Sequence, residues 1–249
     1  MRFRSTVLGC VISIAVSSSV HATTWTADFF DSSYGGQMSN SGDPGFNASA
    51  TGGTLTISET HGALVGMTGH DAVYTNAKFS GDFDARVTVN WSQLPSVDSG
   101  SYIDGSINMY GNDFSFGNFV TGLSGCNSDV YTCSHAFEGI NSVFHGTDFV
   151  ADNSGTIFRI LRLGDTVSEY VGNPAGGDFT LVETDTNPAF ADPVTFSLYS
   201  YYNNGAPTGD GSVSFTNFSV STVPEPSSLA LLTGFFGVIA LRRKRAAKN

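Results

Sequence analysis

The chain of 249 residues is acidic, with 22 Asp and Glu residues against 11 Lys and Arg residues and a formal net charge of −11. Only four basic residues lie between residues 23 and 222, too few for a patch that neutralises phosphates, so nucleic acid is excluded as a partner. The 29 Gly, 20 Phe and 9 Tyr residues are typical of pleated strands joined by tight turns, and the composition predicts an all-β protein.

The first 22 residues have the three parts of a cleavable secretion signal. Two arginines lie within the first four residues, residues 7–20 are mostly apolar, and Val20 and Ala22 supply the small side chains of a cleavage site. We therefore expect the general secretion machinery to export the chain, and signal peptidase to cut between Ala22 and Thr23.

Residues 23–222 contain repeated short segments with the period of a half-buried strand. Apolar and polar side chains alternate over residues 83–91, and residues 103–109, 157–163 and 194–199 repeat the pattern. Turn residues separate the segments, as in Leu163-Gly164-Asp165-Thr166. Many short strands without helices predict one domain over residues 23–222, with a β-sandwich or jelly-roll fold.

Cys126 and Cys133 are the two cysteines that remain once the signal is removed. An even pair in an exported chain predicts a disulfide. A metal site at these cysteines is the rival interpretation, but no second cysteine pair or closely spaced histidine pair supports it. The four histidines of the domain are scattered, and we expect surface or turn positions for His61, His70, His135 and His145. Ca²⁺ stays open as a cofactor, because the many carboxylates suit that ion.

Several segments occur in the order of a known sandwich. The chain reads Ala27-Asp28-Phe29-Phe30-Asp31 near its start, Arg162-Leu163-Gly164-Asp165 later, and Phe215-Thr216-Asn217-Phe218 near the end of the domain. This order resembles the concanavalin-like, or laminin-G-like, jelly rolls, with their opening Asp-Phe strand, Arg-x-Gly-Asp hairpin and closing Phe-Asp-Asn-Phe strand. Phe179 stands where the resemblance implies Trp, and Thr216 where it implies an Asp that often helps to hold a structural calcium.

The sequence lacks the catalytic motif of the glucan hydrolases with this fold. They carry Glu-x-Asp-x-x-Glu on one strand, because one carboxylate attacks while the other donates a proton. The five glutamates here are far apart in sequence, and the neighbouring Asp82 and Asp84 are expected to face water. We therefore expect no catalytic residues.

Binding of carbohydrate through aromatic rings is the better interpretation of the domain. Tyr201 and Tyr202 are the first candidates, because adjacent residues of a strand point to opposite faces and one ring should be exposed. Four further candidates are Tyr102, Tyr110, Tyr131 and Tyr199.

The last 27 residues have three parts in a fixed order. Val223-Pro224-Glu225-Pro226 is followed by an apolar run over residues 229–241 and by Arg242-Arg243-Lys244-Arg245. As a helix the run would be about 20 Å long, shorter than a stable membrane span needs. The basic cluster cannot cross a bilayer cheaply and should stay in the cytoplasm, so we expect a transient membrane stop.

These three parts resemble the PEP-CTERM sorting domain, found on exported proteins of Gram-negative bacteria that make exopolysaccharide. The resemblance implies that exosortase cleaves near Pro224-Glu225-Pro226 and that the protein ends at the cell surface or outside the cell. We therefore expect an exported surface or matrix protein whose sandwich binds exopolysaccharide without catalysis. A structural or adhesion protein without a small ligand, and a glycan hydrolase, are the alternatives.

Overall fold

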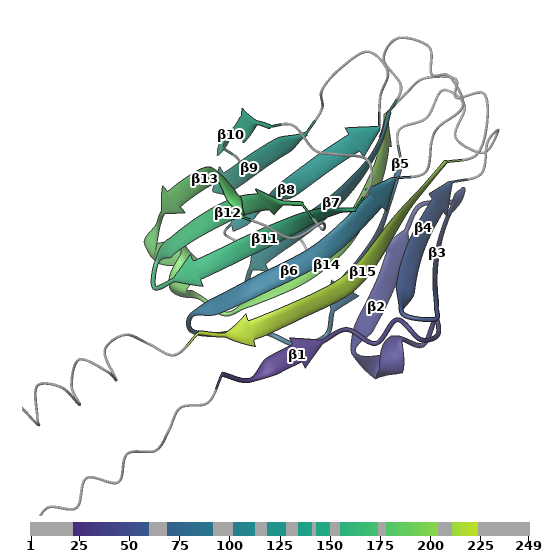
Figure 1. The fold of residues 1–249 in the computed structure, drawn as a ribbon, viewed down its shortest axis with the longest axis horizontal. Helices are drawn as coiled ribbons and strands as arrows, with labels where there is room; N and C mark the ends of the chain where they lie inside the picture. The colour runs from purple at the N-terminus through teal and green to yellow at the C-terminus, as the bar shows by residue number, and fades with distance from the viewer. Residues whose placement is uncertain are drawn as a thin grey trace, which may run out of the picture.

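Two antiparallel β-sheets packed face to face make up the domain (Figure 1). The computed structural model describes residues 22–59, 69–91, 102–112, 119–127, 134–140, 143–149, 155–173, 178–203 and 211–223. In these residues the only helical elements are two short 3-10 turns, η1 (Tyr34–Gly36) and η2 (Pro188–Ala191). The expected all-β sandwich is therefore confirmed.

The first sheet has eight strands, and its long central strands are β6 and β15. Its order is β13 (Thr180–Thr186), β12 (Thr166–Gly172), β11 (Thr156–Leu163), β6 (Phe83–Trp91), β15 (Gly211–Thr222), β4 (Thr54–Glu59) and β3 (Phe46–Thr51), with β1 (Thr24–Thr26) also paired to β15.

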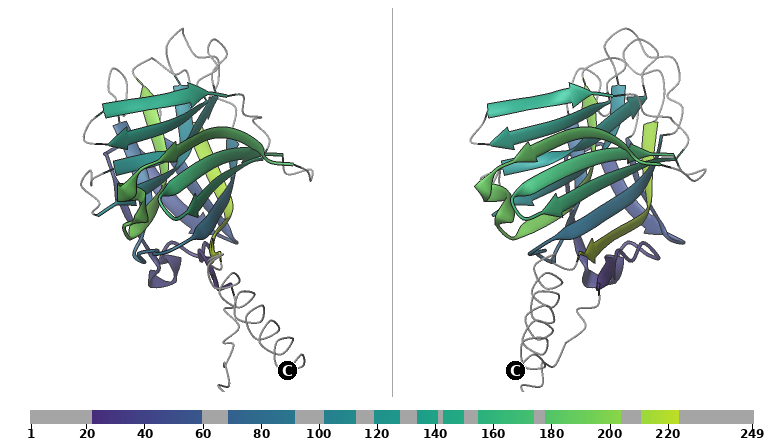
Figure 2. Two further views of the ribbon diagram at one scale, coloured as in Figure 1. Left: turned by 90° about the vertical axis from the view of Figure 1, so that its left-hand side faces the viewer. Right: turned by 60° about the vertical axis from the view of Figure 1, so that its left-hand side comes forward.

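The second sheet has seven strands, with β7 and β14 near its centre. Its order is β10 (Val143–Asp148), β9 (His135–Ile140), β8 (Phe119–Asn127), β7 (Tyr102–Gly111), β14 (Val194–Asn203), β5 (Gly69–Thr75) and β2 (Met38–Gly42). Figure 2 shows the two sheets from other sides.

The core lies between the sheets and follows the alternation expected from the sequence. In β6 every second side chain, from Phe83 to Trp91, is buried, and the intervening side chains are partly or fully exposed. Burial of these apolar side chains is the main stabilising term of the fold. The predicted hairpin turn is also confirmed: Leu163 pairs with Thr166, and Gly164 takes the left-handed conformation that such a turn requires, with φ 63°.

Arg162 is a charged side chain buried within this core. It lies on β11 and is 0% exposed. Its guanidinium group donates hydrogen bonds to the carbonyl oxygens of Gly81 (2.8 Å), Phe190 (2.8 Å) and Asp192 (2.7 Å), and it lies 4.3 Å from the ring centroid of Phe83. Burial lowers the pKa of Arg162 to about 10, so the group is still charged at neutral pH. One side chain thus joins a strand to two loops.

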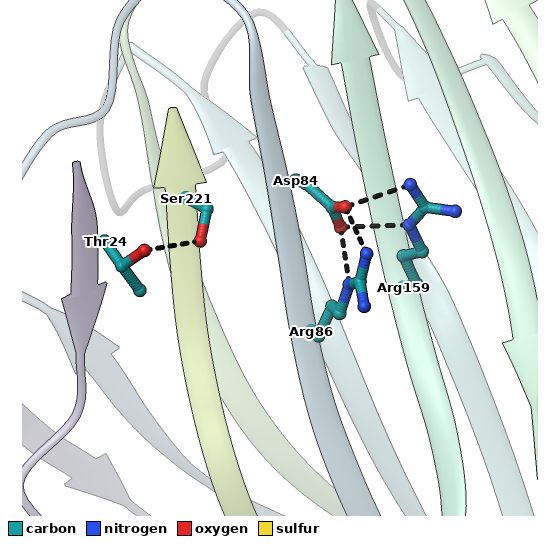
Figure 3. A network of polar contacts seen from close by, with 5 residues as sticks. All are labelled: Thr24, Asp84, Arg86, Arg159 and Ser221. Carbon is teal, nitrogen blue, oxygen red and sulfur yellow. Dashed lines mark hydrogen bonds and ion pairs between the residues drawn. The ribbon is translucent and has the colours of Figure 1, made fainter. Parts of the chain in front are cut away.

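The opposite side of β6 and β11 carries a salt-bridge network (Figure 3). The carboxylate of Asp84 accepts hydrogen bonds from Arg86 and Arg159, both with an Nε contact of 2.9 Å. Burial alone would raise the pKa of Asp84, but the two guanidinium groups outweigh it and hold that pKa below its usual value. Asp84 was expected to face water; it lies on the outward side of the sheet, but its side chain is only 13% exposed. Phe179 lies over the network, with Arg159 at 5.0 Å from its ring centroid.

The two ends of the described chain lie side by side. Thr24 pairs with Ser221 across β1 and β15, and their hydroxyl oxygens are 2.9 Å apart (Figure 3). The neighbouring residues nearer the two chain ends are also paired. The Thr23 amide donates to the Thr222 hydroxyl at 2.9 Å, and the Thr222 amide donates to the Thr23 carbonyl at 2.9 Å. The first and last strands of the described chain therefore lie side by side at one end of the eight-stranded sheet.

The opening Asp-Phe strand that the resemblance implies at residues 27–31 is not present. Residues 27–31 do not form an opening strand, because β1 ends at Thr26. The Asp28 carboxylate accepts the Phe30 amide at 2.9 Å, and the Asp31 carboxylate accepts the Ser33 amide at 2.8 Å. Aspartates bonded in this way to the backbone two residues on form turns in place of strands.

Residues 1–21 of the expected signal, the sorting motif after Val223, the apolar run and the basic cluster lie outside the described residues. Among the residues that are described, none forms a helix long and apolar enough to span a bilayer.

Candidate functional site

The outward side of the seven-stranded sheet carries aromatic and polar side chains at alternate positions of its central strands. On β14, Phe196 and Leu198 point into the core, and Ser197, Tyr199 and Tyr201 lie on the other side. On β7, Ile107 and Met109 point inward, and the outward positions are Asp104, Ser106, Asn108 and Tyr110. We call this outward surface of β5, β7, β8 and β14 the aromatic face.

Three rings form a stack on the aromatic face. His70 on β5 and Tyr199 on β14 have ring centroids 5.4 Å apart at an interplanar angle of 21°. Tyr199 and Tyr201 are 6.4 Å apart at 13°. The register explains the stack, because His70 lies opposite Tyr201 on the neighbouring strand and one diagonal step from Tyr199.

A second ring pair lies further along the same strands. Tyr74 on β5 and Tyr110 on β7 have centroids 6.1 Å apart, although β14 runs between their strands. Ser197 is the β14 residue opposite Tyr74; it is 0% exposed, and its hydroxyl is 3.5 Å from the Tyr110 hydroxyl. A small residue on the middle strand therefore lets the two larger rings meet above it.

Polar groups are placed beside both sets of rings. The Asn108 amide donates to the Tyr110 hydroxyl at 3.1 Å. The Asp104 carboxyl accepts the Tyr201 backbone amide at 2.7 Å and the Ser124 hydroxyl at 3.2 Å. Aromatic rings and hydrogen-bonding groups thus lie side by side on this surface. This combination suits a ligand that has both an apolar face and hydroxyl groups.

Electrostatics favour uncharged groups on the aromatic face. Burial raises the pKa of Asp104 to about 7, although the bonds from Tyr201 and Ser124 oppose the shift. Burial also raises the pKa of Tyr74 to about 12, and burial and then the Asp104 carboxylate raise the pKa of Tyr199. Tyr74 and Tyr199 are therefore neutral hydroxyl groups at physiological pH, able to donate and to accept hydrogen bonds.

Three of the tyrosines expected from sequence lie on the aromatic face, namely Tyr110, Tyr199 and Tyr201. Tyr110 is only 8% exposed, whereas Tyr199 and Tyr201 are partly exposed. The side chains of Tyr102 and Tyr202, and all of Tyr131, lie outside the described part of the chain.

Sequence reasoning missed His70, Tyr74, Asp104 and Asn108. The alternation within β7 could have shown that Asp104 and Asn108 share a face with Tyr110. His70 and Tyr74 could not have been found, because they join the site through the pairing of β5 with β14, strands more than 100 residues apart.

The predicted disulfide is untested. Cys126 lies on β8, but its side chain and the whole of Cys133 are outside the described residues.

The C-terminal end of β15 leads directly into the segment singled out from the sequence. β15 ends at Thr222, and the Val223 amide donates to the Asp82 carbonyl at 2.9 Å. Residues 222–245 match the PEP-CTERM protein-sorting motif. This motif marks an exported protein that is sorted to the cell surface, and the expected recognition is confirmed.

The sandwich is similar to solved structures that include β-1,3-glucanases. LamA from Zobellia galactanivorans, solved in complex with laminaritriose and laminaritetraose, gives a TM-score of 0.57 at 13% identity over 80% of this chain and 98% of that one. The endo-β-1,3-glucanase from Pyrococcus furiosus gives 0.56 at 12% identity over 80% and 93%. A pseudo β-1,3-glucanase of Mycobacterium tuberculosis gives 0.55 at 12% identity over 79% and 96%.

At these identities the similarity establishes the fold alone. A search of curated proteins gave no match to the chain.

Proposed function

We propose that this is an exported surface protein whose sandwich, residues 23–222, binds exopolysaccharide through the aromatic face. Residues 1–22 act as the secretion signal and residues 223–249 as the sorting tail. The observation that carries the proposal is the His70–Tyr199–Tyr201 stack beside the polar groups of Asp104 and Ser124.

The stack suits a sugar ring in two ways. A pyranose has an apolar face of C–H groups that packs on an aromatic ring, and hydroxyl groups at its edges that need hydrogen-bond partners. Tyr199 and Tyr201 supply parallel ring faces, and the neutral hydroxyl groups around them supply partners without the cost of burying a charge. The oligosaccharides bound by LamA are a precedent for a β-glucan on this fold, so a glucan is the first polymer to test.

Binding is favoured over hydrolysis by the inventory of carboxyl groups. The two-carboxylate mechanism places an acid and a second carboxylate on either side of the bond that breaks. Among the described side chains, the outward positions of β7, β8 and β14 carry one carboxyl group, Asp104. Asp104 is held by the Tyr201 amide and Ser124, which fits a positioning role at a binding surface.

The sorting tail belongs to the same proposal. Exosortase of a Gram-negative producer would cleave near Pro224-Glu225-Pro226 while the apolar run 229–241 and the basic cluster 242–245 hold the chain transiently in the membrane. The released domain would then reach the surface or the matrix, where the producer's exopolysaccharide is abundant.

A titration with polysaccharide tests the proposal. The purified full chain, in detergent, is titrated with β-1,3-glucan and with the producer's own exopolysaccharide. Replacing Tyr199 or Tyr201 with alanine should weaken binding roughly tenfold, the equivalent of about 1.4 kcal/mol. Tyr170→Ala is the matched control, because Tyr170 is a partly exposed ring on the other sheet, under Arg159.

Three results would decide against the proposal. Absence of binding to any glycan on an array would favour the structural or adhesion alternative. Equal loss in the Tyr170→Ala control would place the binding surface elsewhere. Release of reducing sugar from the polymer by the pure protein would favour the hydrolase alternative.

A further inference from the structure

Carboxyl groups from both sheets converge at one edge of the sandwich, on the inward side of the seven-stranded sheet, whereas the aromatic face is on its outward side. Glu138 on β9 and His145 on β10 lie opposite each other in the seven-stranded sheet. Glu169 on β12 and Glu183 on β13 lie opposite each other in the eight-stranded sheet. Strands β10 and β13 come together at this edge, as Figures 1 and 2 show.

The two rows of side chains face one another across the space between the sheets. Thr121 on β8 is the next residue in the first row, opposite Glu138. Its hydroxyl donates to the Glu169 carboxylate at 2.6 Å, which bridges the sheets. Asp185, two residues after Glu183 on β13, also points into this space.

Three of these side chains are close enough to share one ion. The His145 Nε2 atom lies 2.8 Å from the Glu138 Oε2 atom. One ligand atom each from Glu138, His145 and Asp185 all lie within 4.8 Å of one another. The His145 side chain is 52% exposed, whereas that of Glu138 is 6% exposed, so the group opens to solvent on one side and is closed on the other.

A second observation points to a cation at this place. Glu169 is 1% exposed, and its Oε2 atom has no hydrogen-bond partner among the described residues. The buried Oε2 atom of Glu183 has none either. A buried carboxylate oxygen without a partner is costly unless a proton or a cation neutralises it. The cluster holds four carboxyl groups and one imidazole, and none of its members is Lys or Arg. A proton or a metal ion is therefore left to neutralise the buried carboxylates.

We propose that Glu138, His145 and Asp185 bind a divalent transition-metal ion, with Zn²⁺ as the best fit, and that Glu169 and Glu183 add negative charge around it. Imidazole nitrogen and carboxylate oxygen are both ligands that Zn²⁺ takes, whereas Ca²⁺ prefers six or more ligands, all of them oxygen. Three protein ligands leave a fourth position for water on the exposed side of His145.

The acid–base properties of the group agree with this assignment. Burial, and then the neighbouring Asp185, raise the pKa of Glu138 to about 7. Burial also raises the pKa of Glu169, with Glu183 and Asp185 adding to the shift. Charged carboxylates are therefore unfavourable at this edge unless a proton or a cation neutralises them.

The metal would join strands that belong to different sheets. Glu138 and His145 come from β9 and β10, and Asp185 comes from β13. A bound ion would therefore close the sandwich at the edge where two outermost strands meet, and it would raise the thermal stability of the domain.

Calorimetric titration with ZnCl₂ tests the site. The untagged full chain, purified in detergent and freed of metal with a chelator, should bind one equivalent of Zn²⁺ and unfold at a higher temperature when loaded. His145→Gln and Asp185→Asn should each weaken binding at least tenfold. His135→Gln is the matched control, because His135 also contacts a carboxylate across β9 and β10, the Asp148 oxygen at 3.0 Å, but is not part of the group.

Several outcomes would overturn the assignment. These are binding of less than about a fifth of an equivalent of Zn²⁺, an equal loss in His135→Gln, or tighter binding of Ca²⁺ than of Zn²⁺. If Asp185→Asn fails to fold, as judged by circular dichroism, the exposed His145→Gln change still decides the question. Because the aromatic face is not involved, loss of Zn²⁺ binding should leave glucan affinity unchanged, and the two proposals can fail separately.

Discussion

Arg162 offers the sharpest test of how the sandwich is held together. Replacing it with methionine keeps a long flexible apolar stem but removes the guanidinium group from a site that water does not reach. The carbonyl oxygens of Gly81, Phe190 and Asp192 then lose their donor. We expect the variant to fold but to be markedly less stable.

The size of the effect follows from the contacts. A buried acceptor without a partner costs about 1–3 kcal/mol, and three acceptors are affected. Part of this loss of stability is offset, because folding no longer transfers a charged guanidinium group out of water. The net loss should be about 3 kcal/mol, or roughly 6–12 °C in Tm for a domain of this size.

Thermal unfolding followed by circular dichroism measures the effect, with Arg159→Met as the control. Arg159 lies on the same strand but on its outward side, and its partner Asp84 keeps its ion pair with Arg86 when Arg159 is replaced, so the loss should be smaller. Arg162→Lys should fall between the wild type and Arg162→Met, because one ammonium group cannot reach all three carbonyls. A Tm for Arg162→Met within 2 °C of the wild type, or a larger loss for Arg159→Met, would refute the reasoning.

Three further predictions concern other parts of the chain. Thiol titration of the unfolded, unreduced exported protein should find no free thiol, and two free thiols would mean that Cys126 and Cys133 are not paired. Asp104 has a folded-state pKa of about 7, above the 3.8 of an ordinary aspartate, so the native state binds more protons and loses stability as pH rises from 4 to 7. Denaturant melts of Asp104→Asn should show a flatter dependence over that range, and an unchanged slope would contradict the shift. Replacing Pro224-Glu225-Pro226 with alanines should trap a longer, membrane-bound form; if intact mass shows that the wild-type exported protein still carries residues 242–249, the tail is a lasting anchor.

Local patterns in the sequence are enough to predict strands and their faces. Alternation over residues 83–91 gives both the extent of β6 and the side that is buried. The Leu163-Gly164-Asp165-Thr166 turn gives the pairing of β11 with β12. Both features depend on neighbours in the chain, so a reader of the sequence can find them.

The sites depend on contacts that no local pattern contains. Arg162 reads as a surface residue in an alternating strand, yet it is buried because loops around residues 81 and 190 bring carbonyl groups to it. His145 was expected at a surface or turn position, and its side chain is indeed 52% exposed, but the β9–β10 hairpin also places it against Glu138. The two positions lie symmetrically about residues 141–142, so a predicted hairpin there could have revealed the pair, although not Asp185 from the other sheet.

The position of the termini would allow the two proposed cleavages to leave the sandwich intact. β1 begins at Thr24, so cleavage after Ala22 removes no residue of the sheet. β15 ends at Thr222, so cleavage between residues 224 and 228 removes none either. Because Thr23 and Thr222 are hydrogen-bonded to each other, the two described ends of the chain lie at the same end of the same sheet. The chain would therefore be held to the membrane by that one end before and after loss of the signal, and the aromatic face and the proposed metal-binding group, which are built from other strands, need no change when the tail is cut.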